Sequence, residues 1–220
     1  MEPVPQSLTL SAEEAVSLLR REAEGLLAQG GRRVLGIAGG PGVGKSTLAM
    51  ALCTAIGADA AYVPMDGFHR PHAALEAEGT AVDKGMPHTF DGEGFVRFLA
   101  ALRAATVTMS GPGYSRRIED VVPDAFTVDA TARLLVVEGN YLLLARSPWW
   151  QVRPLLDRAI FLDIPRALVE RRLMRRHAEE GLFTEARNRA HVARADLPNY
   201  DLVQRSRPRA DIIIGLDTAD

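Results

Sequence analysis

The chain has little cysteine, no long apolar run and almost no net charge. Its single cysteine, Cys53, excludes an intrachain disulfide and leaves no cysteine cluster that would bind zinc. We find neither a secretory leader nor an apolar stretch of about 18 residues, so we expect no membrane association and a cytoplasmic location. The net charge of −2 argues against a nucleic-acid carrier or a polybasic membrane binder.

Lysine is also scarce, because the chain carries 24 arginines but only 2 lysines, Lys45 and Lys84. Where arginine serves at nearly every basic position, a lysine that remains can mark a site that needs a compact ammonium group. For Lys84, a functional role and plain solvation both stay open. With 220 residues, 47% hydrophobic and 25% charged, the chain suits one α/β domain with or without a small insert.

What the chain does have is a strong chemical signature at residues 39–46. These residues read Gly-Gly-Pro-Gly-Val-Gly-Lys-Ser and match G-x-x-x-x-G-K-[ST], the phosphate-binding P-loop. The glycines allow a tight turn in which successive N–H groups point at phosphate oxygens. Lys45 can reach the β- and γ-phosphates, and the Ser46 hydroxyl can bind Mg²⁺. The alternative is a glycine-rich turn that binds nothing.

Short apolar runs alternate with helical patterns along the chain. We expect strands at residues 33–38, 60–65, 134–137, 159–162 and 210–214. We expect helices at residues 11–29, 44–56, 91–103 and 165–180, with another helix starting near residue 184. This alternation predicts an α/β fold with a mostly parallel sheet, in which ligands bind at the carboxyl ends of the strands.

Other segments lack this alternation. Residues 1–6 are predicted to be frayed, and residues 67–90 to form a long loop of the kind that is usually functional or mobile. We expect a strand at residues 106–109 followed by a turn at 110–113. Residues 126–128 are expected to pair nearby.

Two acidic residues follow predicted strands. Asp66 can accept the proton of an acceptor hydroxyl, or simply form a turn before Gly67. Glu138 follows a buried apolar run, where a charge needs a partner: Mg²⁺ with its water shell, an acceptor, or an arginine. Because the P-loop, Asp66 and Glu138 all lie at carboxyl ends of strands, one cleft can hold all three.

The helix predicted at residues 165–180 is rich in arginine. Arg172 and Arg176 lie one turn apart, as do Arg171 and Arg175, and one such pair can clamp a transferring phosphoryl group as the helix closes. The alternative is a solvated face whose arginines pair with nearby glutamates. Gly181 would break the helix, which indicates a hinged lid at about residues 171–190.

Polar and basic residues can form an acceptor pocket beside Asp66. His69 is favoured among the histidines because it lies near Asp66 in the sequence, although a loop histidine is often only solvated. The candidates for this pocket are His69, Arg70, His72, Lys84, His88, Tyr114, Arg116 and Arg117.

Together these motifs resemble the phosphoribulokinase, uridine kinase and pantothenate kinase group of P-loop kinases over residues 33–214. Residues 65–68 (Met-Asp-Gly-Phe) resemble the segment that supplies the catalytic base in that group. Residues 84–91 and 114–124 resemble segments of bacterial pantothenate kinases, and residues 137–139 resemble the second acidic motif of the family. The whole pattern is most similar to bacterial members described as nucleoside/nucleotide kinase-like or as fructose-transport-associated sugar kinases.

The resemblance implies a three-layer α/β/α P-loop NTPase fold with a mostly parallel sheet and a helical lid. It further implies a single kinase domain over residues 1–220, with an acceptor-binding insert at about 67–125 and the lid at about 171–190. ATP and Mg²⁺ are the implied cofactors, and a small molecule is the implied partner. The ATP phosphates would be held by Gly39, Gly40, Gly42, Val43, Gly44, Lys45, Ser46 and Thr47.

The resemblance also implies roles for single residues. Asp66 would be the catalytic base, and Lys45 with Arg172 or Arg176 would stabilise the transferred phosphoryl group. Ser46 and Glu138 would hold Mg²⁺. The acceptor would be contacted by Asp66, His69, Lys84, Tyr114, Arg116 and Glu138.

Departures from the family pattern leave the acceptor open. Arg116 stands where pantothenate kinases usually have histidine, and residues 67–69 differ from the Ser-Phe-Tyr of many uridine kinases. The chain is also shorter than a bacterial pantothenate kinase. A sugar such as fructose, a nucleoside, a pantothenate-like acid and a sugar phosphate all fit, and the basic loop residues favour an acceptor with an anionic group.

Our hypothesis is therefore an ATP- and Mg²⁺-dependent kinase of a small hydroxylated metabolite. A nucleotide-dependent switch or chaperone NTPase that acts on a protein partner is the alternative. A degenerate protein that only binds nucleotide is disfavoured by the intact Lys45, Ser46, Asp66 and Glu138. A homodimer is one possible oligomeric state.

Overall fold

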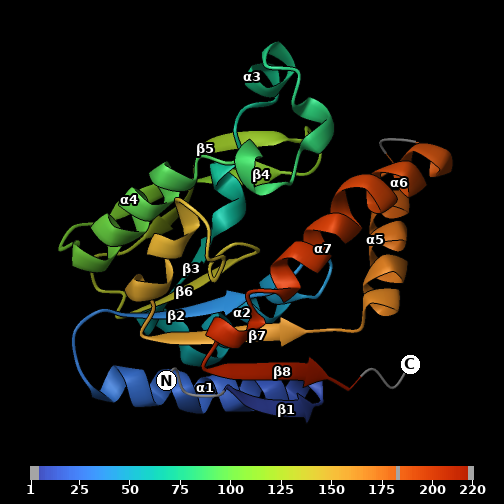
Figure 1. The fold of residues 1–220 in the computed structure, drawn as a ribbon. Helices are drawn as coiled ribbons and strands as arrows, with labels where there is room; N and C mark the ends of the chain where they lie inside the picture. Colours follow the sequence, from blue (N-terminus) through green and yellow to red (C-terminus); the bar gives the residue numbers. More distant parts are fainter. Residues whose placement is uncertain (1–4, 182–183, 218–220) are drawn as a thin grey trace.

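The computed structural model describes residues 5–181 and 184–217, and at its centre lies a six-stranded sheet (Figure 1). The strand order is β1-β8-β7-β2-β6-β3, and every neighbouring pair is parallel. The strands are β1 (Gln6–Leu10), β2 (Arg33–Ala38), β3 (Ala60–Pro64), β6 (Leu134–Gly139), β7 (Arg158–Asp163) and β8 (Ile212–Leu216). The predicted parallel sheet is confirmed.

Helices cover both faces of this sheet, which completes the predicted three layers (Figure 1). Alternate residues of each strand point to opposite faces, so Val34 packs in the core that contains α4 and Leu35 in the core that contains α1 and α2. The helices are α1 (Ala12–Ala28), α2 (Lys45–Ile56), α3 (His72–Ala77), α4 (Gly92–Ala104), α5 (Arg166–Glu180), α6 (Glu185–His191) and α7 (Leu197–Gln204).

Local sequence explains where α1 begins and which face it buries. The Ser11 hydroxyl accepts a hydrogen bond from the backbone N–H of Glu14, and the Glu14 carboxylate accepts one from the N–H of Ser11. This reciprocal capping box satisfies two helix-end donors. Four residues at helical spacing are fully or almost fully buried against the sheet: Ala15, Leu19, Ala23 and Leu26.

The prediction for residues 106–113 was wrong. Only Met109 of the expected strand at 106–109 is in a strand, and the expected turn at 110–113 lies inside β4 (Met109–Ser115). β4 forms an antiparallel hairpin with β5 (Asp120–Val128), which contains the residues 126–128 that were expected to pair. The register shifts between Gly111 and Gly113, so Pro112, which has no N–H to donate, is placed in an irregularity.

Three other boundaries differ from expectation. Gln6, taken as frayed, opens the edge strand β1, while residues 1–4 lie outside the described residues. The segment 67–90 is not one long loop, because it holds α3 and the two 3-10 turns Ala81–Asp83 and Pro87–Thr89. Pro165 is the N-cap residue of α5 and precedes its first turn.

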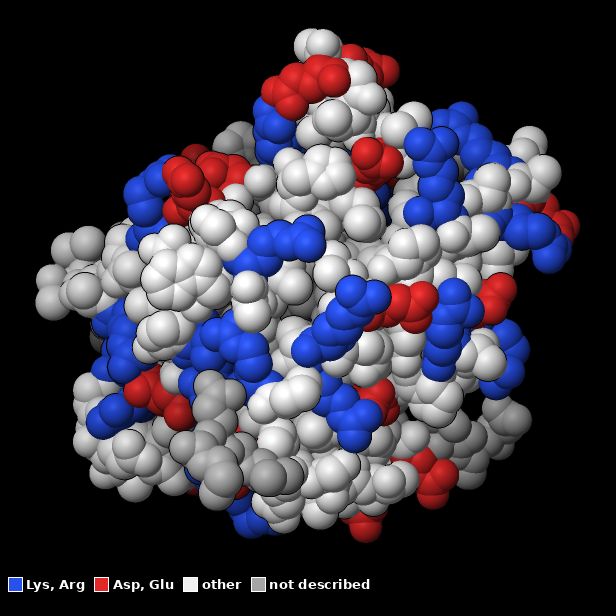
Figure 2. Space-filling view, viewed as in Figure 1, with Lys and Arg blue, Asp and Glu red and all other residues white. Residues whose placement is uncertain are grey.

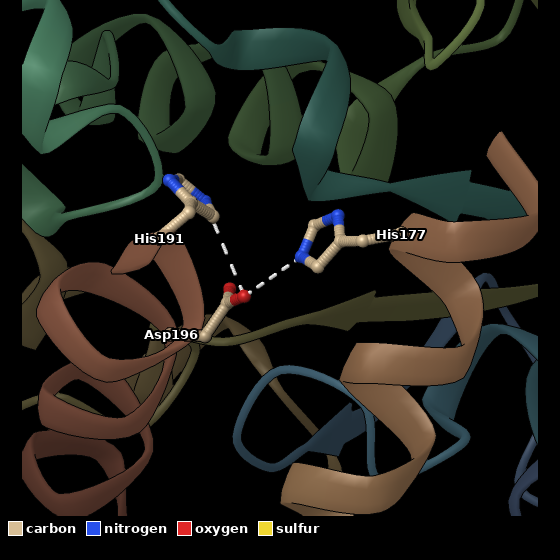
Figure 3. Close-up of side chains that lie close together, drawn as sticks. All are labelled: His177, His191 and Asp196. Carbon is tan, nitrogen blue, oxygen red and sulfur yellow. Dashed lines mark hydrogen bonds and ion pairs between the residues drawn. The ribbon is translucent and has the colours of Figure 1, made fainter. Parts of the chain in front are cut away.

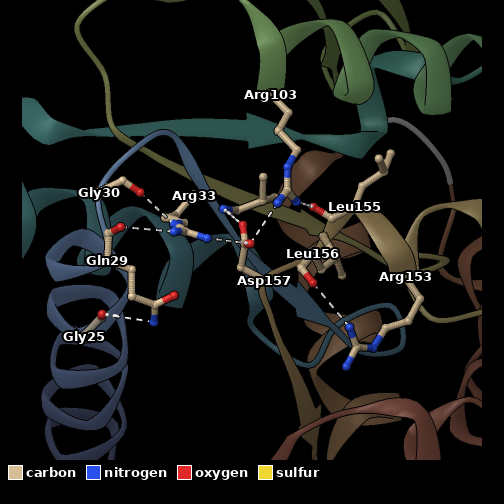
Figure 4. Close-up of polar contacts among 10 residues, drawn as sticks. Gly25, Gln29, Gly30, Arg33, Arg103, Arg153, Leu155, Leu156 and Asp157 are labelled. Atoms are coloured by element: carbon tan, nitrogen blue, oxygen red, sulfur yellow. Dashed lines mark hydrogen bonds and ion pairs between the residues drawn. The ribbon is translucent and has the colours of Figure 1, made fainter.

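A partly buried carboxylate, Asp157, joins elements at the amino-terminal edge of the sheet, where no ligand is expected (Figure 4). Asp157 accepts hydrogen bonds from the Val34 N–H at 2.8 Å, from Arg103 Nη2 at 2.8 Å and from Arg33 Nη1 at 3.4 Å. These contacts join the start of β7 to β2 and α4. The P-loop, Asp66 and Glu138 lie at the opposite edge, at the carboxyl ends of β2, β3 and β6.

The charge on the surface is mixed, as the composition predicts. On the face seen in Figure 2, basic and acidic side chains are interspersed and no broad area of one sign dominates. Among the described residues, no helix is both long and apolar enough to span a membrane.

Candidate active site

The P-loop connects β2 to α2, as the sequence predicts. β2 ends at Ala38 and α2 begins at Lys45, with Gly44 as the N-cap residue in a left-handed conformation at φ 101°. L-residues rarely adopt this φ, which explains a glycine here. No side chain caps this helix end, so its N–H groups remain available for a phosphate.

Lys45 is buried inside this loop. Its ammonium donates to the Gly40 carbonyl at 2.9 Å and to Asn140 Oδ1 at 2.7 Å. Burial lowers the pKa of Lys45, and the nearby carboxylates of Glu138 and Asp66 act in the opposite direction. A bound phosphate would add negative charge beside a cation that burial has stripped of water.

Glu138 lies directly beside the P-loop because its strand, β6, is the neighbour of β2. Its Oε1 accepts hydrogen bonds from Ser46 Oγ at 3.0 Å and from the Tyr62 hydroxyl at 2.8 Å. The residue is 4% exposed, and this burial raises the pKa of Glu138 while Lys45 opposes the rise. The serine and carboxylate oxygens form a donor set of the type that Mg²⁺ prefers, so these residues fit the ion.

Asp66 lies in the 3-10 turn Met65–Phe68 that follows β3. The turn packs against the β4–β5 hairpin so closely that a Cβ added at Gly67 would lie 1.8 Å from the Pro112 carbonyl oxygen. Residue 67 must therefore be glycine, because the backbone of the hairpin comes too close for a side chain. The strand end and the hairpin together fix the position of the carboxylate.

A chain of alternating charges runs from Asp66 to helix α5. Arg116 Nη2 lies 4.0 Å from Asp66 Oδ2, and Arg116 Nη1 lies 3.7 Å from Glu180 Oε1. Arg176 Nε lies 3.8 Å from the same oxygen of Glu180. Within residues 5–181 and 184–217, neither Arg176 Nε nor Glu180 Oε1 has a hydrogen-bond partner, although both atoms are buried. This link between α5 and Asp66 is therefore electrostatic and leaves hydrogen-bonding capacity unused.

His69 stands between two aromatic rings next to Asp66. Its ring centroid lies 3.8 Å from that of Phe90 and 4.6 Å from that of Tyr114. Its Nδ1 lies 2.8 Å from the Asp66 carbonyl oxygen, which assigns the proton of the neutral ring to Nδ1. Burial lowers the pKa of His69, and the Asp66 carboxylate opposes this effect. The neutral imidazole leaves Nε2 as an acceptor.

Lys84 approaches the same aromatic group from the loop before Phe90. Its Nζ lies 5.3 Å from the centroid of the Tyr114 ring and contacts the Glu119 carbonyl oxygen. Burial lowers the pKa of Lys84. The structure thus brings His69, Tyr114 and Lys84 together.

These groups line one cavity of about 490 Å³ between the hairpin, the 67–90 segment and the lid. Seven of the residues selected from the sequence line it: Asp66, His69, His72, Lys84, Tyr114, Arg116 and Arg176. A volume of this order accommodates a small metabolite.

Other predicted residues lie elsewhere. Arg172 donates to the Val43 carbonyl of the P-loop at 3.3 Å and does not line the cavity. Arg70 pairs with Glu78, and His88 lies beside Asp83, so both point into other contacts. Arg117 is exposed.

Sequence reasoning assigned no site role to several polar residues that the structure places here. Tyr62 holds Glu138, and Asn140 holds Lys45. The Tyr141 hydroxyl lies 2.8 Å from Asn199 Oδ1, and Asn199 Nδ2 donates to the Gly85 carbonyl at 2.9 Å. The available signal was the polar Asn-Tyr pair that directly follows the acidic strand end at 138–139.

Comparison with known proteins agrees with this geometry. The model of the phosphoribulokinase / uridine kinase family matches residues 34–217. A Schizosaccharomyces pombe protein provisionally named uridine kinase C227.14 is 32% identical over 207 residues, which cover 89% of this chain and 88% of that protein. The pantothenate kinase of Sodalis glossinidius is 32% identical over 170 residues, or 70% of this chain and 54% of that enzyme.

A solved structure shows the same relationship. A Silicibacter sp. TM1040 protein, provisionally described as a fructose transport system kinase, has a TM-score of 0.81 at 34% identity, with 90% of this chain and 98% of that chain covered. The family model spans most of the chain, and the S. pombe and Silicibacter proteins are each more than 30% identical and covered over 88% and 98% of their length, so the chain belongs to the phosphoribulokinase / uridine kinase family of ATP-dependent small-molecule kinases.

Proposed function

We propose that this kinase transfers the γ-phosphoryl group of ATP to a hydroxyl of a small metabolite that also carries an anionic group. The observation that carries the proposal is that the P-loop, Glu138 and Asp66 lie at one edge of the sheet, with Asp66 on the wall of the adjoining cavity. Phosphoryl transfer needs this combination of phosphate binding, charge neutralisation and an oriented acceptor.

The P-loop and Lys45 would bind the nucleotide phosphates. N–H groups of residues 39–47 and the start of α2 supply donors, and Lys45 supplies the cation. Lys45 already donates to Gly40 and Asn140, so we infer that it turns from these neutral acceptors to phosphate oxygens. That exchange gives a desolvated ammonium an anionic partner.

Ser46 and Glu138 would hold Mg²⁺, directly or through its water shell. When bound, this ion would neutralise charge on the β- and γ-phosphates. Tyr62 orients the Glu138 carboxylate by donating to Oε1 at 2.8 Å. The protein groups therefore fix the ion's ligands before any nucleotide arrives.

Asp66 would act as the general base. It takes the proton of the acceptor hydroxyl as that oxygen bonds to the γ-phosphorus, while the bond to the β–γ bridging oxygen breaks and ADP leaves. Arg176, which lines the same cavity, would stabilise the charge on the transferring group. Arg172 would act at the P-loop, where it contacts Val43.

The cavity supports an acceptor with a carboxylate or phosphate. Lys84 lies on the cavity wall, where its ammonium contacts the Glu119 carbonyl and the Tyr114 ring, and we infer that it would bind the anionic group of the acceptor. Arg116 lies between Asp66 and Glu180 at 4.0 and 3.7 Å, outside hydrogen-bond distance of both. The His69 ring and Tyr114 would pack against the body of the acceptor.

The domain boundaries form part of the proposal: one kinase domain at 1–220, an acceptor-binding insert at 67–125 and a lid at 171–190. Residues 182–183 of this lid lie outside the described residues. A cytoplasmic location and a homodimer stay predictions from the sequence, which cell fractionation and light scattering would test.

The test is acceptor-dependent ADP release from ATP and Mg²⁺ across fructose, uridine, pantothenate, glycerate and sugar phosphates. We expect one anionic acceptor to raise ADP release well above the background hydrolysis. Asp66→Asn should abolish most of kcat with ATP affinity near wild type. The matched control is Asp124→Asn, because Asp124 is exposed and its φ of 49° is tolerated by asparagine.

The outcomes separate the hypotheses. Unchanged turnover in Asp66→Asn would refute its role as base. Preference for a neutral sugar or nucleoside would refute the anionic acceptor and retain the kinase. A panel without response, with slow hydrolysis alone, would favour an NTPase that acts on a protein.

A further inference from the structure

Three metal-ligating side chains converge on the lid side of the cavity (Figure 3). His177 lies in the last turn of α5, His191 ends α6, and Asp196 ends the π-helical turn Val192–Asp196. Asp196 Oδ2 lies 2.9 Å from His177 Nε2 and 4.0 Å from His191 Nε2. One ligand atom from each residue lies within 4.8 Å of the other two.

The spacing of these atoms fits a small divalent cation. A tetrahedral centre with bonds of about 2.1 Å holds its ligand atoms about 3.4 Å apart. The observed 2.9 and 4.0 Å lie on either side of this value, so side-chain rotations alone can bring the three atoms to it. Two imidazole nitrogens and one carboxylate oxygen suit zinc and related transition metals better than Mg²⁺, which prefers oxygen ligands.

The environment of His177 gives an independent reason to expect a cation. Its Nε2 lies 2.9 Å from Asp196 Oδ2, and its Nδ1 lies 3.3 Å from Glu180 Oε2. A neutral imidazole has only one N–H, so it can donate to only one of these two carboxylates. The second nitrogen would meet a carboxylate with its lone pair, unless the ring is an imidazolium or a cation lies between them.

Glu180 also matches the usual support of a metal-bound histidine. Such a histidine generally donates its other ring N–H to a carboxylate, which fixes its tautomer and its orientation. In the structure His177 Nε2 is hydrogen-bonded to Asp196 Oδ2 at 2.9 Å, and a metal would replace this bond, with the ring proton moving to Nδ1, which lies 3.3 Å from Glu180 Oε2. The side chains of His177 and Asp196 are each 12% exposed, which protects the cluster from bulk water, while that of His191 is 40% exposed and gives an ion access.

We propose that His177, His191 and Asp196 form a binding site for a divalent transition metal, with Zn²⁺ as the best-fitting ion and Glu180 as the positioning residue. This site is separate from the Mg²⁺ ligands Ser46 and Glu138. His177, His191 and Asp196 all line the cavity in which the acceptor would bind.

The site would also couple the two sides of the lid. His177 precedes the left-handed C-cap Gly181 (φ 66°), whereas His191 and Asp196 follow it. A metal held by all three would fasten α5 to α6 across that glycine. The bound metal would thus restrain lid opening, whatever acceptor the enzyme uses.

The test is a titration of tag-free, chelator-treated full-length protein with Zn²⁺ in the presence of excess Mg²⁺, followed by calorimetry. We expect one equivalent to bind. Asp196→Asn, which preserves shape, and His191→Ala should each weaken Zn²⁺ binding about 100-fold. The matched control is His88→Ala, because His88 also lies 3.5 Å from a carboxylate but outside the cluster. Circular dichroism would verify that each variant folds.

Two further readouts sharpen the test. Co²⁺ in place of Zn²⁺ should give the visible absorption of a tetrahedral centre, and this absorption should disappear in Asp196→Asn. Zn²⁺ should slow tryptic cleavage after the lid arginines Arg187, Arg189 and Arg194 in wild type but not in that variant.

The contrary results are equally definite. Absence of Zn²⁺ binding, or equal binding in Asp196→Asn and His88→Ala, would overturn the site. Cluster-dependent binding without protection from trypsin would overturn the coupling of the lid helices. Neither result bears on the ADP-release test of kinase function.

Discussion

The substitution Glu138→Gln separates the effect of the Glu138 charge on the stability of the apoprotein from its effect on binding of Mg²⁺ and nucleotide. Glu138 is 4% exposed and receives both of its hydrogen bonds, from Ser46 and Tyr62, on one oxygen. An amide oxygen accepts the same two bonds, so the substitution removes a buried charge without removing these contacts. Lys45 loses an opposite charge, which offsets part of the gain.

For the apoprotein we therefore expect a free energy of unfolding within about 1 kcal/mol of wild type at pH 7. The pH dependence has a definite sign. Burial raises the pKa of folded Glu138 above its ordinary 4.5, so the wild type loses stability as the pH rises from about 4.5 through the folded-state pKa. Glutamine has no such loss, so the variant gains on the wild type over this window.

With Mg²⁺ and a non-hydrolysable ATP analogue, we expect the wild type to be more stable than the variant. A ligand at 100 times its Kd stabilises the folded state by about 2.7 kcal/mol. If the altered ligand weakens binding of the metal–nucleotide about 100-fold, the same concentration stabilises the variant by only about 0.4 kcal/mol. Without ligand, the free energies of unfolding of the variant and the wild type should thus be similar. With the metal and the ATP analogue, the variant should be less stable than the wild type by about 2 kcal/mol.

The assay is urea unfolding followed by tryptophan fluorescence, with Trp149 buried in the core as the reporter. Glu93→Gln on the exposed face of α4 is the control, and should leave both values unchanged. A loss of about 3 kcal/mol or more without ligand would show that the Glu138 charge is a structural requirement. Full ligand stabilisation in Glu138→Gln would refute the assignment of Glu138 to the metal.

Three further predictions test other parts of the structure. Lys45→Ala should weaken ATP binding and lower kcat together, each by roughly 10- to 100-fold, and intact activity would refute the P-loop assignment. Gly67→Ala should lower the free energy of unfolding by about 1–3 kcal/mol, because the added Cβ would lie 1.8 Å from the Pro112 carbonyl oxygen. Gly25→Ala on α1, where the added Cβ meets no atom within 4 Å, should raise it by about 0.5–1 kcal/mol. Urea titration measures both free energies, and equal effects would contradict the contact at Gly67. Burial raises the pKa of Cys53 to about 11 from 9.0, so Ellman's reagent at pH 8 should react about 100-fold more slowly than with urea-unfolded protein, and similar rates would refute the burial.

The sequence predicts the nucleotide edge of the site well because strand ends determine it. In a parallel sheet, the carboxyl ends of neighbouring strands meet at one edge. β6 lies between β2 and β3, with Glu138 in register with Ile37 and with Pro64. A motif after β2, a carboxylate after β3 and a carboxylate at the end of β6 therefore had to lie close together.

Prediction failed where pairing partners are distant or backbone signals conflict. β1 has only five residues and pairs with β8 at the far end of the chain, so nothing local distinguishes it from a frayed terminus. Residues 110–113 contain two glycines and a proline, which usually indicate a turn. The hairpin tolerates them because close packing on Phe98 and Phe126 leaves no space for a Cβ at Gly111.

The lid shows the limit of helical spacing as a guide to function. Arg172 and Arg176 lie one turn apart, and spacing alone makes them equivalent. Packing separates them, because Arg172 contacts Val43 of the P-loop whereas Arg176 lines the cavity and faces Glu180. Their variants should therefore differ: loss of Arg172 acts on the nucleotide side, and loss of Arg176 acts on the transfer itself.

The unused hydrogen-bonding capacity of Arg176 explains why a lid arginine suits phosphoryl transfer. Arg176 Nε and Glu180 Oε1 lie 3.8 Å apart, and both are buried without a hydrogen-bond partner in the part of the chain that the structure describes. A guanidinium held by charge but not by hydrogen bonds keeps its donors for a transferring phosphoryl group. Glu180 also faces His177 at 3.3 Å, so any cation bound by His177 and Asp196 would compete with Arg176 for the charge of Glu180. Under the proposed roles, metal binding by His177 and Asp196 and the release of Arg176 toward the phosphoryl group would be linked through the Glu180 carboxylate.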